Sequence, residues 1–241
     1  MKAAATLAKG SRPSRLSLSE QAYCLIRDSI LRGQARPGTV LSRRKLAEEL
    51  GMSFLPISEA LQRLENDGLV ESRPRAGTRV RIPAFDEVRG RYVVREALEA
   101  QSARLCCERA TFQQRLELRR MAEQLDTLYD RAESSPQDPD FQFIVHTHHM
   151  ALHMRIAEYS GAPQLREAIE KNHVLVYNWF YDVATERTSL PRHFHSGLID
   201  IVTGDDILAA DETMRKHVQH GLTDILAKIA PMPAGEWRAR R

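Results

Sequence analysis

Histidines form the group of residues whose type and spacing most directly predict chemistry in this sequence. All nine lie between residues 146 and 220. His149 and His153 are four residues apart, so on a helix they share one face, and His146 lies on the same side. Two imidazoles at this spacing can hold one metal ion. His195 and His217 stand among apolar neighbours farther along, so they could reach the same point inside a helical bundle.

Two other interpretations of the histidines remain open. Most histidines in proteins are hydrogen-bonded residues of a core or a surface. A metal with an open coordination position could instead activate water for hydrolysis. However, no aspartate or glutamate stands at a spacing from the histidines that would indicate a catalytic base. We therefore expect that the protein is not an enzyme. Zinc, nickel, copper and iron all suit imidazole ligands, and the expected cofactor is a divalent transition metal, zinc or nickel.

The elements that would position these histidines are long helices. From Phe85 onward the chain lacks strand patterns, and turn signals separate its helical stretches. The predicted helices, with Thr111 as the cap of the second, cover about 86–110, 112–133, 140–160, 163–187, 190–203 and 205–229. They predict an all-α antiparallel helix bundle over residues 84–230, followed by a flexible tail over 231–241.

A different pattern occupies residues 42–82. Leu46 and Leu50 lie on one face of a short helix, Gly51 ends it, and Ser53 is a natural N-cap for a second helix. The apolar residues of that second helix, Ile57, Ala60, Leu61 and Leu64, recur at helical spacing. Two short runs around Pro74 to Gly77 then alternate like a β-hairpin. This is the pattern of a winged helix-turn-helix, although a small packed domain without DNA would show it too.

The chain before this motif predicts a first helix and a basic arm. Ser19 is expected to cap a helix that ends near Gly33 and whose core face is formed by Ala22, Ile26, Ser29 and Ile30. Residues 1–17 carry basic and small residues and are expected to be a disordered arm, so the DNA-binding domain spans 18–83. Residues 1–83 have a net charge of +7 and residues 84–241 one of −4. The positive charge therefore lies where phosphates would bind.

The outward face of the second helix would enter the major groove of DNA. Ser58 and Gln62 can hydrogen-bond to base edges, and glutamine favours adenine. Phe54 either contacts a thymine methyl group or packs against its own domain or a partner. Gly77 at the wing tip allows the protein backbone to approach the minor groove closely. The expected DNA contacts are Arg43, Arg44, Ser53, Phe54, Ser58, Gln62, Arg75, Gly77 and Arg79.

Length and composition limit the remaining possibilities. A chain of 241 residues suggests two domains, and its apolar fraction of 42% is ordinary for a soluble protein. It has no uncharged apolar run of about 18 residues, so we expect no membrane span. The N-terminus lacks the apolar stretch of a signal peptide. The three cysteines form no pattern of disulfide pairs, which is consistent with a reducing cytoplasm. We expect them to be small apolar residues of the core.

The N-terminal residues resemble a known family. Residues 18–82, with ILRGQARPGTVLSRRKLAEELGMS and PISEALQRLENDGLVESRPRAGTRV, resemble the GntR family of bacterial transcription regulators. That family commonly contacts DNA through an arginine at the start of the second helix, two arginines on the recognition helix and a glycine at the wing tip. Arg44 and Gly77 match these positions, whereas Phe54 and Ser58 replace the two recognition-helix arginines. The resemblance implies the winged helix-turn-helix fold with an unusual operator.

The second part resembles the FCD domain of FadR-type members of that family, with six helices as in the VanR-like subgroup. The resemblance is carried by EVRGRYVVREALEAQSARLCCERAT, HMALHMRIAEYSGAPQL and HSGLIDIVTGDDILAADETMRKHV. The family's ligands, one aspartate and three histidines, fall on His149, His153, His195 and His217, with His149 in place of the aspartate. Four neutral ligands would leave a net charge of +2 for an anionic effector to neutralise. The resemblance also implies that Arg95 helps to bind a carboxylate effector. Alternatively, Arg95 forms a salt bridge with Glu99, four residues farther along the helix.

Together these features predict a mainly α protein with an N-terminal winged helix-turn-helix and a C-terminal all-α bundle. We expect a cytoplasmic homodimer that reads an inverted repeat in double-stranded DNA, acts as a repressor, and responds to a small organic acid near the metal. In a second interpretation the regulator senses the metal ion itself. The sequence does not identify the effector or the operator.

Overall fold

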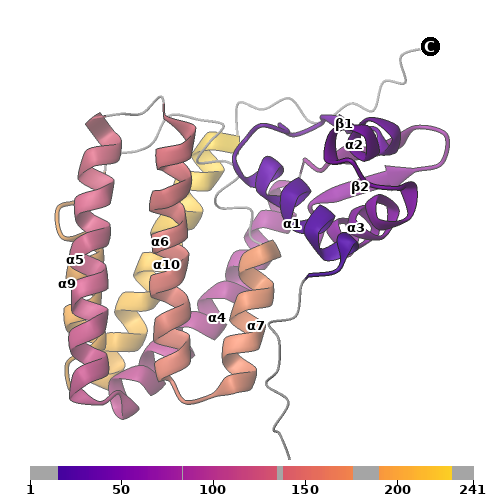
Figure 1. Cartoon of the computed structure of the whole chain (residues 1–241). Helices are drawn as coiled ribbons and strands as arrows, with labels where there is room; N and C mark the ends of the chain where they lie inside the picture. Colours follow the sequence, from indigo (N-terminus) through magenta and orange to yellow (C-terminus); the bar gives the residue numbers. More distant parts are fainter. Residues whose placement is uncertain (1–15, 83, 135–137, 176–189, 230–241) are drawn as a thin grey trace, which may run out of the picture.

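The computed structural model describes residues 16–82, 84–134, 138–175 and 190–229. The first part of the chain folds into three helices and a small antiparallel sheet whose strand order is β1-β3-β2 (Figure 1). Its elements are α1 (Leu18–Leu31), β1 (Val40–Leu41), α2 (Arg43–Leu50), α3 (Phe54–Asn66), β2 (Val70–Arg73) and β3 (Gly77–Val80). This confirms the predicted winged helix-turn-helix.

The start of α1 differs from the prediction. The N-cap is Ser17, whose hydroxyl accepts a hydrogen bond from the Glu20 N–H, while the Glu20 carboxylate accepts one from the Ser17 N–H at 2.8 Å. A glutamate three residues after the serine forms a reciprocal capping box, which Ser19 lacks because Ala22 is its third neighbour. The helix therefore begins two residues earlier than a cap at Ser19 would place it.

The core of the first part follows the predicted helical faces. Ile57, Ala60, Leu61 and Leu64 of α3 are buried, and α3 packs against α1. Gly51 has a φ of 62° at the end of α2, a left-handed conformation that glycine adopts without steric cost. Ser53 occupies the N-cap position of α3, but its side chain makes no capping hydrogen bond.

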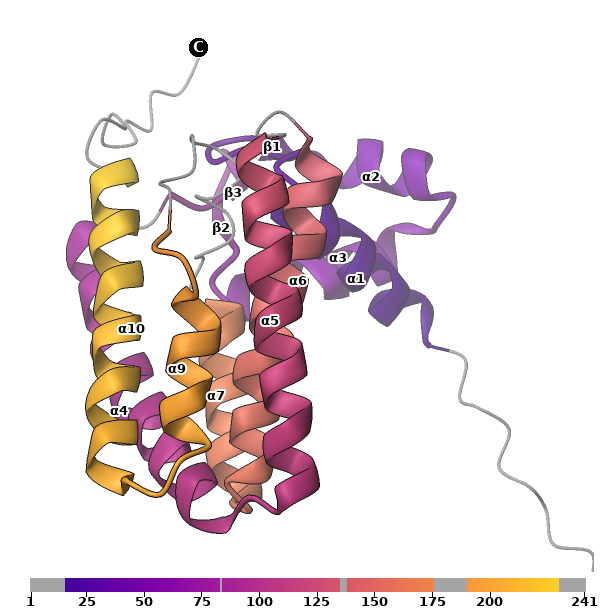
Figure 2. The same cartoon turned by 90° about the vertical axis from the view of Figure 1, so that its left-hand side faces the viewer.

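The second part is the predicted bundle (Figures 1 and 2). Its helices are α4 (Phe85–Arg109), α5 (Phe112–Ser134), α6 (Pro139–Tyr159), α7 (Pro163–Leu175), α9 (Phe194–Val202) and α10 (Ile207–Ile229). α4 packs against α6, α7 and α10, and α5 packs against α6 and α9. The helix predicted over 163–187 is described only as far as Leu175, because 176–189 lie outside the described residues.

The breaks between the bundle helices are capped by side chains. Thr111 and Gln114 exchange side-chain to backbone hydrogen bonds, which confirms the predicted cap of α5. The helix predicted from residue 190 begins only at Phe194, because His193 has a φ of 60° that no right-handed helix accommodates.

Cys106 and Cys107 are buried core residues, and burial raises the pKa of the Cys106 thiol to about 12. No described helix has the length and apolar character that a membrane span requires.

The two parts touch at one end of the bundle. Arg32, at the C-terminus of α1, pairs with Asp140 in the first turn of α6 at 2.5 Å, and its guanidinium lies 4.3 Å from the centre of the Phe143 ring. Arg81, just after β3, pairs with Glu87 of α4 at 2.8 Å. α4 and α6 therefore both connect the histidine-bearing bundle to the winged helix.

The packing of α3 predicts a contrast between two of its leucines. Leu64 is 0% exposed and Leu55 is 68% exposed. We expect Leu64→Ala to lower the free energy of unfolding by about 2–5 kcal/mol, because it leaves a cavity in the core. Leu55→Ala should change it by no more than about 0.5 kcal/mol. Urea denaturation followed by circular dichroism measures both, and equal losses would contradict this placement of the α3 core.

Candidate metal centre and DNA-binding surface

Three imidazole nitrogens meet between α6 and α10. His149 and His153 lie one turn apart on α6, and His217 reaches them from α10. The Nε2 atoms are 2.9 Å apart for His149 and His153, 3.2 Å for His153 and His217, and 3.4 Å for His149 and His217. Nitrogen ligands about 2.0–2.1 Å from a tetrahedral metal ion lie about 3.3 Å from one another. The spacing of this cluster fits a metal centre.

The fourth predicted ligand, His195, stands at the edge of the same cluster. It comes from the first turn of α9 and is 0% exposed. Its ring centre lies 5.0 Å from that of His149 and 5.5 Å from that of His217. The structure thus brings three predicted ligands to ligand spacing and places the fourth in ring contact with them.

Polar side chains contact the Nδ1 atoms of these imidazoles and so orient their rings. His153 Nδ1 contacts the Glu99 carboxylate on α4, and His195 Nδ1 lies 2.8 Å from Asp126 on α5. An imidazole whose Nδ1–H donates to a carboxylate keeps a lone pair on Nε2, the atom that would bind a metal. The Tyr129 hydroxyl lies 3.4 Å from His149 Nδ1.

Burial favours the uncharged form of two histidines of the cluster. Burial lowers the pKa of His149 and of His217 well below the usual value of an imidazole, and the neighbouring histidines lower it further. Neutral imidazoles offer lone pairs, and lone pairs that face one another at these distances repel unless a cation or a proton lies between them. The donor set is therefore suited to a transition metal ion.

Arg95 lies beside the cluster and makes the ion pair that the sequence offered as its second role. Its Nε donates to Glu99 Oε1 at 2.6 Å, and both side chains are no more than 3% exposed. Glu99 therefore joins Arg95 to His153. On the opposite side, a Cβ at Gly221 of α10 would lie 3.9 Å from Arg95 Nη1 and 3.5 Å from the Tyr92 hydroxyl. At residue 221, α10 therefore approaches Arg95 and Tyr92 closely.

Two further nitrogens near this approach are buried. His217 Nδ1 and His220 Nε2 have no hydrogen-bond partner among the residues that the structure describes. Phe194 lies between their rings, with centres 4.8 Å and 4.9 Å away. Buried polar atoms of this kind are usually satisfied by a water molecule or a ligand.

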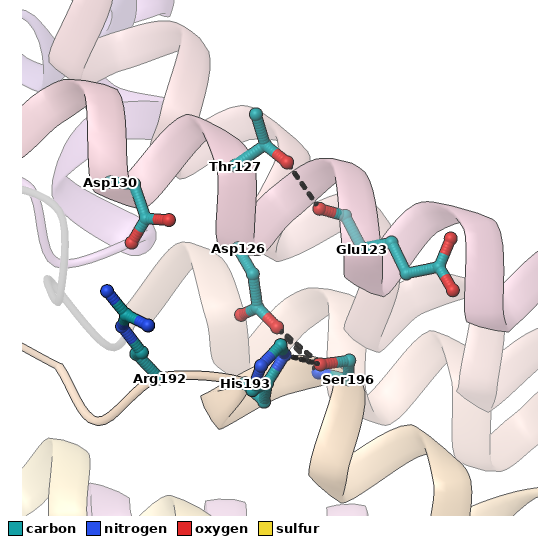
Figure 3. A pocket seen from close by; sticks show the side chains of 7 residues that line it. All are labelled: Glu123, Asp126, Thr127, Asp130, Arg192, His193 and Ser196. Atoms are coloured by element: carbon teal, nitrogen blue, oxygen red, sulfur yellow. Dashed lines mark hydrogen bonds between the residues drawn. The ribbon is translucent and has the colours of Figure 1, made fainter.

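A polar pocket of about 300 Å³ lies between α5 and the residues at the start of α9 (Figure 3). Asp126 separates it from the histidine cluster and caps α9, accepting hydrogen bonds from the Ser196 hydroxyl and from the N–H groups of His195 and Ser196. The lining residues are Glu123, Asp126, Thr127, Asp130, Arg192, His193 and Ser196.

The winged helix presents most of its predicted DNA-contacting residues at the surface. Arg43 and Arg44 at the start of α2 are exposed, as are Ser53 and Gln62 of α3, while Ser58 is half-buried. Phe54 is 59% exposed, which rules out packing into the core of its own domain.

The wing carries the remaining predicted contacts. Arg75 and Gly77 are exposed and have positive φ values of 61° and 87°. Arg79 differs from them, because it pairs with Glu71 of β2 at 2.7 Å and its side chain is only 12% exposed. Of these predicted contacts, Arg75 is therefore the exposed cation.

Two family matches cover most of the chain. Residues 18–80 match the family described as "Bacterial regulatory proteins, gntR family", and residues 91–220 match the FCD domain. The second match alone spans more than half of the sequence. The chain belongs to the GntR family, with an FCD domain. The family is one of bacterial regulatory proteins, as the resemblance predicted.

Known relatives agree with this assignment. The GntR regulator is 29% identical over 122 residues to the HTH-type transcriptional repressor RspR of Escherichia coli, a match over 47% of this chain and about half, 54%, of the relative. This chain shares its fold with the solved structure of E. coli McbR/YncC, with a TM-score of 0.71 and 22% identity. The match covers 89% of this chain and 99% of the other. A GntR regulator from Rhodococcus sp. RHA1 gives a TM-score of 0.67 at 21% identity, with coverage of 87% and 97%.

Sequence reasoning missed several residues of the histidine site. Asp126 and Tyr129 were not predicted, and Glu99 was considered only as a partner of Arg95. Asp126 lies 69 positions from His195, so no local spacing relates the two residues. The one available signal was the i,i+4 pair of Arg95 and Glu99 on a helix that also had to face the histidines.

Proposed function

We propose that this GntR regulator is a homodimeric repressor that reads an inverted repeat and releases it when a small carboxylic acid binds beside a metal ion. The observation that carries the proposal is the cluster of His149, His153 and His217 nitrogens, joined through Glu99 to the buried Arg95. The exposed face of α3 and the cations around it support the DNA-reading role. The repressor name of the E. coli relative supports the direction of regulation.

The metal would be held by His149, His153 and His217, with His195 as the fourth ligand. Imidazole donors favour zinc or nickel over hard ions such as magnesium. When bound, the ion would supply positive charge that attracts an anion into the buried site. Glu99 and Asp126 keep two of the imidazoles in the orientation that such an ion needs.

The acid would bind on the side of the cluster that faces Arg95. Its carboxylate would meet the guanidinium of Arg95 close to Gly221, and its remaining polar groups would satisfy His217 Nδ1 and His220 Nε2. Phe194, between those two rings, would contact the apolar part of the acid. These contacts suit a small polar acid rather than a long fatty chain.

The signal would reach DNA along α6. This helix carries His149 and His153 on its C-terminal half and Asp140 in its first turn, where Arg32 of α1 pairs with it. A helix moves as a stiff rod, so a shift at the histidines would displace the Arg32 contact and with it the winged helix. Effector and DNA would then oppose each other reciprocally.

The DNA-reading role is tested by selecting duplexes from a random pool with the full chain. We expect one enriched inverted repeat, bound by a dimer. Arg44→Ala and Arg75→Ala should each lower the slope of log affinity against log salt by about 1, because each removes a phosphate contact. Arg79→Ala is the matched control within the wing and should change the slope less. Binding that lacks sequence preference would contradict the proposal.

Metal binding is tested with zinc chloride and isothermal titration calorimetry on the full chain. We expect one zinc ion per chain, with His153→Ala abolishing binding and Glu99→Gln weakening it about 10- to 100-fold. His148→Ala is the matched control, because His148 is half-buried on the same helix and bonds only to the Ile144 carbonyl among the described contacts of its ring. No zinc binding, or an equal loss in His148→Ala, would contradict the metal centre. Zinc that changes operator affinity without any acid would instead support a metal sensor.

Arg32→Ala tests the route from the bundle to the reading head. A thermal-shift screen of two- to six-carbon acids with the zinc-loaded protein first identifies a binding acid. We expect the acid to weaken operator affinity about 5- to 150-fold in the wild type and by a smaller factor in Arg32→Ala, with acid binding itself retained. Arg27→Ala, which removes a pair confined to α1, should leave that factor unchanged. An unaltered factor in Arg32→Ala would rule out this route.

A further inference from the structure

The reading face of α3 carries no cation. Its one charged residue, Glu65, lies near the C-terminal end of the helix and accepts a hydrogen bond from the Ser72 N–H of β2. At about 100° per residue, Phe54, Leu55, Ser58 and Gln62 fall within about 100° of the helix circumference. This face points away from the buried positions Ile57, Leu61 and Leu64. Its two N-terminal residues are large and apolar, with exposed fractions of 59% for Phe54 and 68% for Leu55.

The helix offers no cation to guanine. Its one basic residue is Arg63, whose guanidinium lies 4.1 Å from the centre of the Tyr23 ring of α1. Tyr23 is itself fixed by a hydrogen bond of 2.6 Å to Asp67. Bidentate reading of guanine O6 and N7 requires an arginine or lysine in the groove. Such contacts are therefore not available from the exposed face of α3.

We propose that Phe54 and Leu55 read the 5-methyl groups of thymine, so that each half-site carries A·T pairs where the N-terminus of α3 enters the major groove. The inference rests on the proposed DNA-reading role of this helix. The thymine methyl is the apolar group of the major groove, and it suits an apolar side chain better than any other base edge does. Because residues 54 and 55 point about 100° apart, they contact different bases.

The charges around this face favour DNA as its occupant. Arg43 and Arg44 lie at the start of the adjacent helix α2, and Arg75 lies at the wing tip, all exposed. They would attract the phosphates that border the groove, whereas the apolar pair would contact only the bases. Salt should therefore weaken the phosphate contacts and leave the methyl contribution unchanged.

The test removes single methyl groups from DNA. Duplexes enriched by the full chain from a random pool are resynthesised with deoxyuridine in place of one thymine at a time, which deletes only the 5-methyl group. At one or two positions per half-site, we expect a loss of about fourfold in wild-type affinity, the effect of burying one methyl group. The loss should be the same at low and high salt.

Variants of the protein assign the effect to its residues. Phe54→Ser and Leu55→Ser should bind the thymine duplex more weakly, and each should lose the uracil effect at its own position. Gln62→Ala is the matched control on the same face and should retain the full effect. Both apolar residues are exposed, so the variants should melt at the wild-type temperature.

Two results would overturn the inference and separate it from the proposed function. Enriched duplexes that tolerate uracil at every position within twofold would contradict methyl reading while leaving the regulator intact. Uracil sensitivity that survives in both Phe54→Ser and Leu55→Ser would assign methyl reading to other residues. A chain that enriches no sequence at all would contradict the proposed function as well.

Discussion

The bundle depends on the Glu99 carboxylate, which is buried between Arg95 and His153. All three side chains are no more than 3% exposed. A carboxylate taken out of water costs several kcal/mol unless a cation and hydrogen-bond donors surround it, and removal of either partner leaves the charge uncompensated. Glu99 therefore fixes α4 against α6 in one register. The orientation of His153, and with it the geometry of the imidazole cluster, follows from this pairing.

The histidine site was predictable as far as local periodicity reaches. The i,i+4 spacing of His149 and His153 places them on one face of any helix, and their convergence follows from α6 alone. Which residues meet them from other helices depends on packing between segments far apart in sequence. Apolar neighbours made His195 and His217 candidates, and resemblance to the FCD domain named them as ligands. The supporting residues Asp126 and Tyr129 could be found only in the folded bundle.

The winged helix shows the same division. Its buried positions on α3 recur at 3.6-residue spacing, so the core could be derived from the sequence. The ends of the helices were less predictable. Ser17 and Ser19 are both natural N-caps for α1, and the Glu20 carboxylate selects Ser17 by accepting a hydrogen bond from the Ser17 N–H. The state of each cation was not predictable either. Arg79 and Arg75 look alike in sequence, yet a cross-strand carboxylate holds only Arg79.

The division of charge between the two ends of the molecule has a consequence for regulation. The reading face of α3 carries no cation, so sequence preference would reside in short-range contacts that need close insertion of the helix, while the arginines around it attract any duplex. A displacement of the winged helix by a fraction of a helical turn would disrupt those short-range contacts and leave the long-range attraction almost unchanged. An effector that acts through the Arg32 contact would therefore reduce specificity more than affinity for random DNA. The released regulator would stay near DNA, ready to rebind its operator once the acid is consumed.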